Sequence, residues 1–101
     1  MLVIAGHVCI DPEKRSEASA AASEVMIATR EERGCISYTF SADLGDESLF
    51  HVFEEWESQE ALDAHFQTPH MAVFQQKLGA LGVSEMKIQK YAVASVGPLR
   101  D

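Results

Sequence analysis

The chain has 101 residues, the size of a single domain with one hydrophobic core. Sixteen acidic residues against eight basic ones give a formal net charge of -8, which disfavours nucleic acid and anionic membranes as partners. No apolar run approaches the ~20 residues of a membrane span, and the start lacks the basic region and long apolar core of a signal peptide. We therefore expect a cytoplasmic protein with one domain over residues 1–95 and an exposed tail over residues 96–101.

The chain begins with a segment, residues 2–10, in which apolar residues occupy both alternating positions. This pattern predicts a strand that is buried on both faces. Asp11 and Pro12 predict the start of a helix, because aspartate caps a first turn and proline fits the first helical position. Apolar residues recur at helical spacing until Gly34, so we expect a helix over residues 12–33, whose middle carries only alanine and serine.

Two strands and two helices follow in the sequence. Alternating large residues predict strands over residues 35–41 and 49–56, and the second strand again has apolar residues on both faces. Ser58 predicts the start of one helix, because serine is a preferred N-cap. The pair Thr68-Pro69 predicts the start of the next helix in the same way, with a proline in its first turn.

With a last strand over residues 85–94, the elements follow the order β-α-β-β-α-β of the ferredoxin-like α+β fold. Right-handed crossovers place the helices on one face of a four-stranded antiparallel sheet, and the other face stays bare. Two strands that are apolar on both faces would then expose more apolar surface than a monomer normally shows. We therefore expect a homodimer in which the bare faces of two sheets pack together, with a pocket between helices and sheet in each copy.

Four short segments resemble a known family, and in chain order they are Gly34-Cys35-Ile36-Ser37-Tyr38, Glu54-Glu55-Trp56-Glu57-Ser58, Glu60-Ala61-Leu62-Asp63-Ala64-His65 and Thr68-Pro69-His70. Their order and spacing resemble the antibiotic biosynthesis monooxygenase family, also called the quinol-monooxygenase-like family. The resemblance covers essentially the whole chain. It implies a dimeric α/β barrel of ferredoxin-like monomers, and oxidation of a quinol or hydroxyaromatic by dioxygen without metal or flavin.

Relatives in this family also act on polyketide intermediates, degrade haem or isomerise a phosphorylated signal molecule. Two alternatives to a cofactor-independent monooxygenase therefore stay open. One is an isomerase, or another transformation of a small signal metabolite, and the other is a dimeric protein that only binds a small molecule. The alanine- and serine-rich first helix departs from the family pattern, which affects the shape of the pocket.

Histidine is the natural base for such a reaction, because its pKa lies near neutrality. His65 is our candidate for the catalytic base, since it shares the apolar stripe of its helix with Leu62 and Phe66 and matches the helix histidine of the family. A core histidine bonded to a backbone carbonyl is the alternative. His70, at the start of the next helix, is a candidate for substrate binding or for capping that helix.

Three further residues are candidates for substrate binding. His7 is an unusual residue for an apolar strand, where it either reaches a pocket or bonds to a neighbouring strand. Tyr38 and Trp56 have the same parity on successive strands and either form an aromatic wall for a flat substrate or belong to the core. Glu54 and Glu55 point to opposite faces of a strand, so we do not expect a catalytic carboxylate pair.

The sequence predicts no metal and no cofactor. His65 and His70 are separated by a proline, without the spacing of a metal motif, and no cluster of further ligands surrounds them in the sequence. The chain also lacks a glycine-rich phosphate loop. Cys9 and Cys35 have neither metal nor disulfide spacing, and we interpret them as buried thiols in a reducing compartment. The expected partners are an aromatic or quinol substrate, dioxygen and a second copy of the chain.

Overall fold

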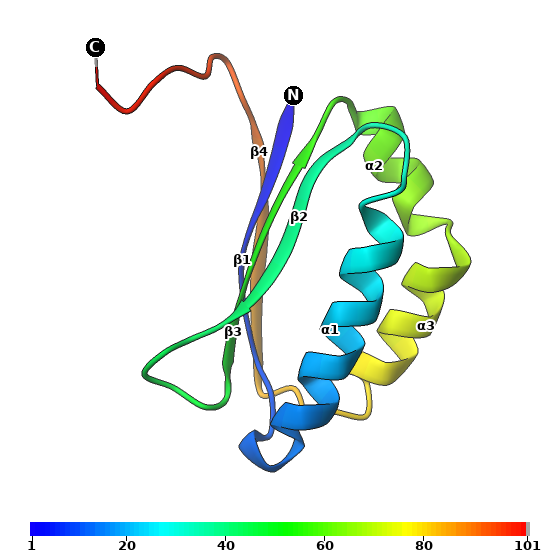
Figure 1. Ribbon diagram of the computed structural model, residues 1–101, viewed down its shortest axis with the longest axis vertical. Coiled ribbons are helices and arrows are strands. Elements are labelled where there is room, and N and C mark those ends of the chain that lie inside the picture. Colours follow the sequence, from blue (N-terminus) through cyan, green and yellow to red (C-terminus); the bar gives the residue numbers. More distant parts are fainter. Residues whose placement is uncertain (101) are drawn as a thin grey trace.

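The computed structural model describes residues 1–100 and contains one antiparallel sheet with all the helices on one side of it (Figure 1). The strands are β1 (Leu2–Cys9), β2 (Cys35–Ala42), β3 (Leu49–Trp56) and β4 (Glu85–Ala92), and the helices are η1 (Pro12–Lys14), α1 (Arg15–Thr29), α2 (Gln59–Phe66) and α3 (Pro69–Leu78). In space the four strands follow the order β2-β3-β1-β4. This architecture confirms the predicted ferredoxin-like α+β fold with helices on one face.

The first helical segment is shorter than its predicted extent of residues 12–33. Asp11 caps it as expected, but the first turn is the 3₁₀ helix η1, and α1 ends at Thr29. Beyond that point the chain tightens, because the backbone N–H of Glu32 donates to the carbonyl of Thr29, three residues back rather than four. Gly34 then adopts a φ of 87°, which glycine tolerates without strain, and turns the chain into β2.

The other elements agree closely with their predicted bounds. Ser58 and Thr68 cap α2 and α3, since their hydroxyl oxygens accept hydrogen bonds from the backbone N–H groups of Ala61 and Met71. The last strand ends at Ala92, two residues earlier than predicted. The caps fix where α2 and α3 begin, and therefore which side chains these helices direct toward the sheet.

The alternation of side chains gives the sheet two different faces. The inner face, which the helices cover, holds the buried core residues Ile4, Val8, Tyr38, Phe50, Val52 and Trp56. On the opposite, outer face Phe53 and Tyr91 are 47% and 48% exposed. Figure 1 shows no element covering this face among the described residues. The outer face is therefore the bare face that the sequence predicted.

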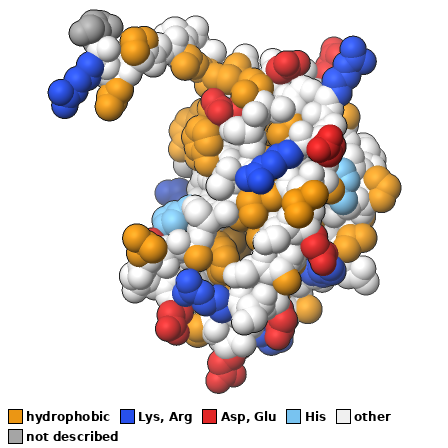
Figure 2. All heavy atoms as spheres, viewed as in Figure 1, with side chains coloured by type: hydrophobic (Ala, Val, Ile, Leu, Met, Phe, Trp, Pro, Cys, Tyr) orange, Lys and Arg blue, Asp and Glu red, His pale blue; other side chains and the backbone are white. Residues whose placement is uncertain are grey.

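After β4 the chain leaves the sheet, and residues 96–100 form neither helix nor strand. Val96 and Leu99 are 73% and 97% exposed, and Figure 2 shows this segment projecting from the body of the molecule. Residue 101, the end of the predicted tail, lies outside the described residues. Within residues 1–100, no helix combines the length and the hydropathy that crossing a membrane requires.

Candidate functional site

Three side chains from separate parts of the chain, Glu32, His65 and His70, meet beside the end of α1, and we call them the histidine–glutamate cluster. The distance from His65 Nδ1 to Glu32 Oε2 is 2.8 Å, and the distance from His70 Nε2 to the same oxygen is 2.7 Å. The side chains of His65, Glu32 and His70 are 1%, 13% and 27% exposed. The cluster is therefore closed to solvent at His65 and open at His70.

Two short connections position the cluster. Glu32 lies in the tight turn that follows α1, whereas His65 lies in the last turn of α2 and His70 in the first turn of α3. Thr68 joins these two helices, because its hydroxyl donates to the His65 carbonyl at 2.7 Å and accepts from the Met71 N–H at 3.3 Å. The same residue thus ends one histidine-bearing helix and starts the other.

The cluster determines which nitrogen of His65 carries the hydrogen. An ionised carboxylate only accepts hydrogen bonds, so both imidazole nitrogens that face Glu32 must donate. We therefore assign the hydrogen of neutral His65 to Nδ1, which leaves a lone pair on Nε2. This Nε2 is fully buried and has no hydrogen-bond partner among the described residues. Because buried polar atoms are normally partnered, such an atom is a candidate to bind a ligand.

A cavity of about 170 Å³ lies between the inner face of the sheet and helices α2 and α3, and we call it the inner cavity. His65, Tyr38 and Glu54 line it together with a mainly apolar wall. Phe66 and Met86 also line it and are 51% and 49% exposed, so they mark where the cavity reaches the surface. The arrangement is a small apolar cavity with a few polar groups, as is typical of binding sites for small molecules.

Glu54 is a carboxyl group in largely apolar surroundings. It is 7% exposed, and its Oε1 accepts a hydrogen bond of 2.9 Å from Trp56 Nε1. Burial raises the pKa of Glu54 to about 7; the bond from Trp56 opposes this rise and the charge of Glu32 adds to it. A carboxyl group that changes protonation near neutral pH in a cavity is a candidate for proton transfer.

Tyr38 and Trp56 flank the ring of His65. Their ring centroids lie 5.3 Å and 4.8 Å from the centroid of His65. Tyr38 lines the inner cavity, and burial raises the pKa of its hydroxyl, which keeps it neutral. Trp56 is 0% exposed and does not belong to the cavity lining. Trp56 therefore bonds to Glu54 and packs against His65, a placement that favours the core alternative for this residue.

The other two histidines lie on the outer face of the sheet. His7, predicted as a pocket residue, does not line the inner cavity, and its Nε2 is 3.3 Å from Glu85 Oε2. It shares the parity of Val3 rather than that of the buried Ile4, so its side chain leaves the sheet on the other side. His51 is half exposed and lies 2.8 Å from Asp43.

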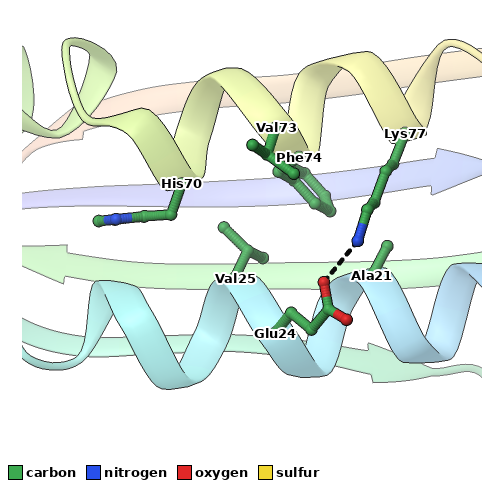
Figure 3. Close-up of a pocket in the computed structure, with 7 residues that line it drawn as sticks. All are labelled: Ala21, Glu24, Val25, His70, Val73, Phe74 and Lys77. Atoms are coloured by element: carbon green, nitrogen blue, oxygen red, sulfur yellow. Dashed lines mark hydrogen bonds and ion pairs between the residues drawn. The ribbon is translucent and has the colours of Figure 1, made fainter.

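A second hollow of about 140 Å³, which we call the helix groove, runs between α1 and α3 (Figure 3). Ala21 and Val25 of α1 form one wall, because the small side chains predicted for the middle of this helix leave space there. Figure 3 shows His70 at one end of the groove and Lys77 at the other, where it pairs with Glu24. The groove exposes the His70 side of the histidine–glutamate cluster.

From the sequence we expected no cluster of further ligand residues around His65 and His70. The structure shows that this expectation was wrong. Glu32 lies between them, and the ligand-type atoms of the three residues all lie within 4.8 Å of one another. Glu32 is 33 residues from His65 in the chain and lies in a turn, where no periodic pattern marks it. The burial of Glu54 could have been predicted from the sequence, because Glu54 lies two residues from Trp56 on the same, buried face of the strand.

Comparisons with known proteins agree with this architecture. The family model described as antibiotic biosynthesis monooxygenase matches residues 1–77. An uncharacterized protein of Synechocystis sp. is 36% identical over 98 residues, which cover 97% of this chain and 67% of the relative. YcnE of Bacillus subtilis, which is named as a candidate monooxygenase, is 30% identical over 74 residues, which cover 73% of this chain and 78% of the relative.

Solved structures share the fold over nearly the whole chain. A protein from Deinococcus radiodurans, described as a candidate antibiotic biosynthesis monooxygenase, superposes with a TM-score of 0.91 at 25% identity and covers 100% of both chains. Rv0793 from Mycobacterium tuberculosis superposes with a TM-score of 0.83 at 28% identity, covering 96% of this chain and 97% of its own. Family model, relatives and fold agree, and this chain belongs to the antibiotic biosynthesis monooxygenase family.

Proposed function

We propose that this protein is a cofactor-independent monooxygenase that oxidises a small quinol or hydroxyaromatic with dioxygen, and that His65 is its general base. The main support is that His65 lines a largely apolar cavity and that its buried Nε2 has no hydrogen-bond partner among the described residues. Membership of the family and the name of the relative YcnE support monooxygenase chemistry in general.

Ground-state dioxygen reacts with such a substrate only after it has received one electron, so the substrate must first become an electron-rich anion. In the proposed reaction, His65 Nε2 takes the proton of the substrate hydroxyl, and Glu32 stabilises the imidazolium through Nδ1. One oxygen atom then bonds to a ring carbon and the other leaves as water, while the substrate supplies the electrons. The apolar side chains that line the inner cavity limit access of water to the anion.

The size of the inner cavity narrows the class of substrate. An apolar cavity of about 150 Å³ holds a benzene ring, and the inner cavity has about 170 Å³. A single hydroxylated ring therefore fits beside His65 and Tyr38. Larger substituents would extend past the exposed side chains of Phe66 and Met86 at the surface.

A second candidate function is isomerisation by proton transfer, and Glu54 favours it. Its carboxyl group lines the same cavity as His65 and has a pKa of about 7. A carboxyl group and an imidazole that line one cavity could remove a proton from one carbon and return it to another. Such a reaction consumes no dioxygen, which distinguishes it from the first candidate.

Oxygen consumption with a panel of single-ring and two-ring quinols tests the proposed function. His65→Ala should lower turnover about 10²–10⁴-fold, the usual contribution of general-base catalysis. Alanine suits a helix, but His65 is one of the largest fully buried side chains, so the variant should lose stability and its folding must be checked by circular dichroism. His51→Ala is the matched control, since His51 is also paired with a carboxylate but lies on the outer face.

The panel also separates the alternatives. Equal turnover by the two variants would mean that His65 is only a core histidine and that the proposed base is wrong. Conversion of a substrate without oxygen consumption would support the isomerase, and binding without any conversion would support a protein that only holds a small molecule.

A further inference from the structure

We propose that the histidine–glutamate cluster binds a divalent transition-metal ion of the Zn²⁺ or Co²⁺ type, and that the bound ion prevents His65 from acting as a base. Binding of the ion is independent of the proposed function. Its effect on turnover rests on that function.

The donor set suits such an ion. Two imidazole nitrogens and one carboxylate oxygen are preferred ligands of zinc and of the neighbouring transition metals. In the cluster these three atoms lie within 4.8 Å of one another. An ion bound about 2.0–2.2 Å from each ligand would require the two imidazole nitrogens to move away from the Glu32 oxygen, to which they now bond at 2.8 Å and 2.7 Å, and toward each other. The net charge of -8 also favours the approach of a cation.

The ring of His65 separates this site from the inner cavity. Its Nδ1 faces Glu32, and neither Glu32 nor His70 lines the cavity that His65 lines. An ion at the cluster would bind Nδ1 without occupying the space for a substrate. Because a neutral imidazole carries a single hydrogen, that hydrogen would move to Nε2. Nε2 would then be a donor without a lone pair, and it could not accept a proton from a substrate.

The route from solvent to the cluster and the missing hydrogen-bond partner of His65 Nε2 both agree with metal binding here. His70 is 27% exposed and stands at one end of the helix groove, so an ion can reach the cluster from solvent without passing through the inner cavity. Nε2 of His65 has no hydrogen-bond partner among residues 1–100. In the metal-bound form its N–H could donate to an acceptor in the inner cavity, as the second nitrogen of a metal-bound histidine usually does.

Titration of the purified protein with Co²⁺ tests the proposal, because the visible absorption of the ion changes when nitrogen and oxygen ligands bind it. We expect one ion per chain and a rise in melting temperature with Co²⁺ concentration. Glu32→Gln and His70→Ala should each weaken binding by at least about tenfold. Because His70 is partly exposed, His70→Ala stays informative even if Glu32→Gln folds poorly.

His51→Ala is the matched control, because it removes a surface histidine that also lies beside a carboxylate. It should leave Co²⁺ binding unchanged. Nitrogen-15 spectra with diamagnetic Zn²⁺ should show the His65 hydrogen moving from Nδ1 to Nε2, which needs no substrate. Absence of stoichiometric binding, or equal binding by wild type, Glu32→Gln and His70→Ala, would overturn the metal site. Binding that leaves the hydrogen on Nδ1 would overturn the effect on His65.

Discussion

Glu32 bonds to His65, and Glu54 lines the same cavity as His65, and the surroundings of these two glutamates give them different roles. Glu32 receives hydrogen bonds from two imidazoles and holds them in fixed orientations. Glu54 receives one bond, from the indole of Trp56, and its burial raises its pKa to about 7. In the proposed reaction Glu32 therefore acts only through His65, whereas Glu54 is a candidate to exchange a proton inside the inner cavity.

The raised pKa of Glu54 has a consequence for stability. Below its ordinary value of 4.5 the carboxyl group is protonated in both the folded and the unfolded chain. Between pH 4.5 and about pH 7 only the unfolded chain ionises, so the free energy of unfolding falls as pH rises. Above that window the loss is complete and is on the order of 3 kcal/mol. Glu54→Gln keeps an oxygen for Trp56 and removes the ionisation.

Glu54→Gln should therefore gain stability relative to wild type between pH 5 and pH 8. Urea unfolding at the two pH values measures the change. Glu55→Gln is the matched control, because Glu55 is adjacent in the chain but bonds to Ser37 on the outer face at 2.8 Å. If both variants show the same pH dependence relative to wild type, burial does not raise the pKa of Glu54.

The sequence predicted the site residues unevenly, for a physical reason. His65 could be found because its position on a helical stripe is a local property. The burial of Glu54 could also be predicted from a local pattern, because side chains alternate along a strand and Glu54 shares the face of Trp56. The position of Glu32 could not be predicted in this way, since its contact with both histidines depends on where a turn after α1 lies relative to two other helices.

At the scale of elements, the joint between α2 and α3 decides the geometry of the cluster. Thr68 bonds to the last turn of one helix and the first turn of the other. Thr68→Ala should lower the free energy of unfolding by about 1 kcal/mol, the usual cost of a lost N-cap, measured by urea unfolding. It should also lower turnover, because His65 and His70 lose a common support.

Two variants give this prediction its controls. Thr68→Ser keeps a hydroxyl for both bonds and should restore stability and turnover. Ser58→Ala removes the cap at the other end of α2 and should cost similar stability while leaving the cluster in place. An equal loss of turnover in Ser58→Ala and Thr68→Ala would show that helix stability, rather than the joint, controls the site.

Elements were predicted well where local chemistry determines them. The caps at Ser58 and Thr68 require only a hydroxyl beside the first turn, and both helices begin there. The end of α1 was predicted too late, because the residues before Gly34 can continue a helix or form a turn. Packing of the cluster favours the turn, which brings Glu32 to His65.

For the molecule as a whole, the two faces of the sheet differ in what covers them. The inner face is covered by the helices and contains the cavity, whereas the outer face has no cover among the described residues. Phe53 and Tyr91 are about half exposed on the outer face. Monomers rarely leave such a sheet face in water, so a second copy of the same face is its natural cover. The inner cavities would then lie on opposite sides of the pair.

A homodimer should accordingly have about twice the monomer mass of 11.1 kDa in light scattering. Phe53→Glu should give monomers, because two carboxylates would be buried without partners in the interface. Phe66→Glu is the matched control, since Phe66 is 51% exposed but lines the inner cavity on the helix side, and it should remain dimeric. A monomeric wild type would exclude the proposed dimer. Dissociation by Phe66→Glu but not by Phe53→Glu would place the interface on the helical side of the molecule.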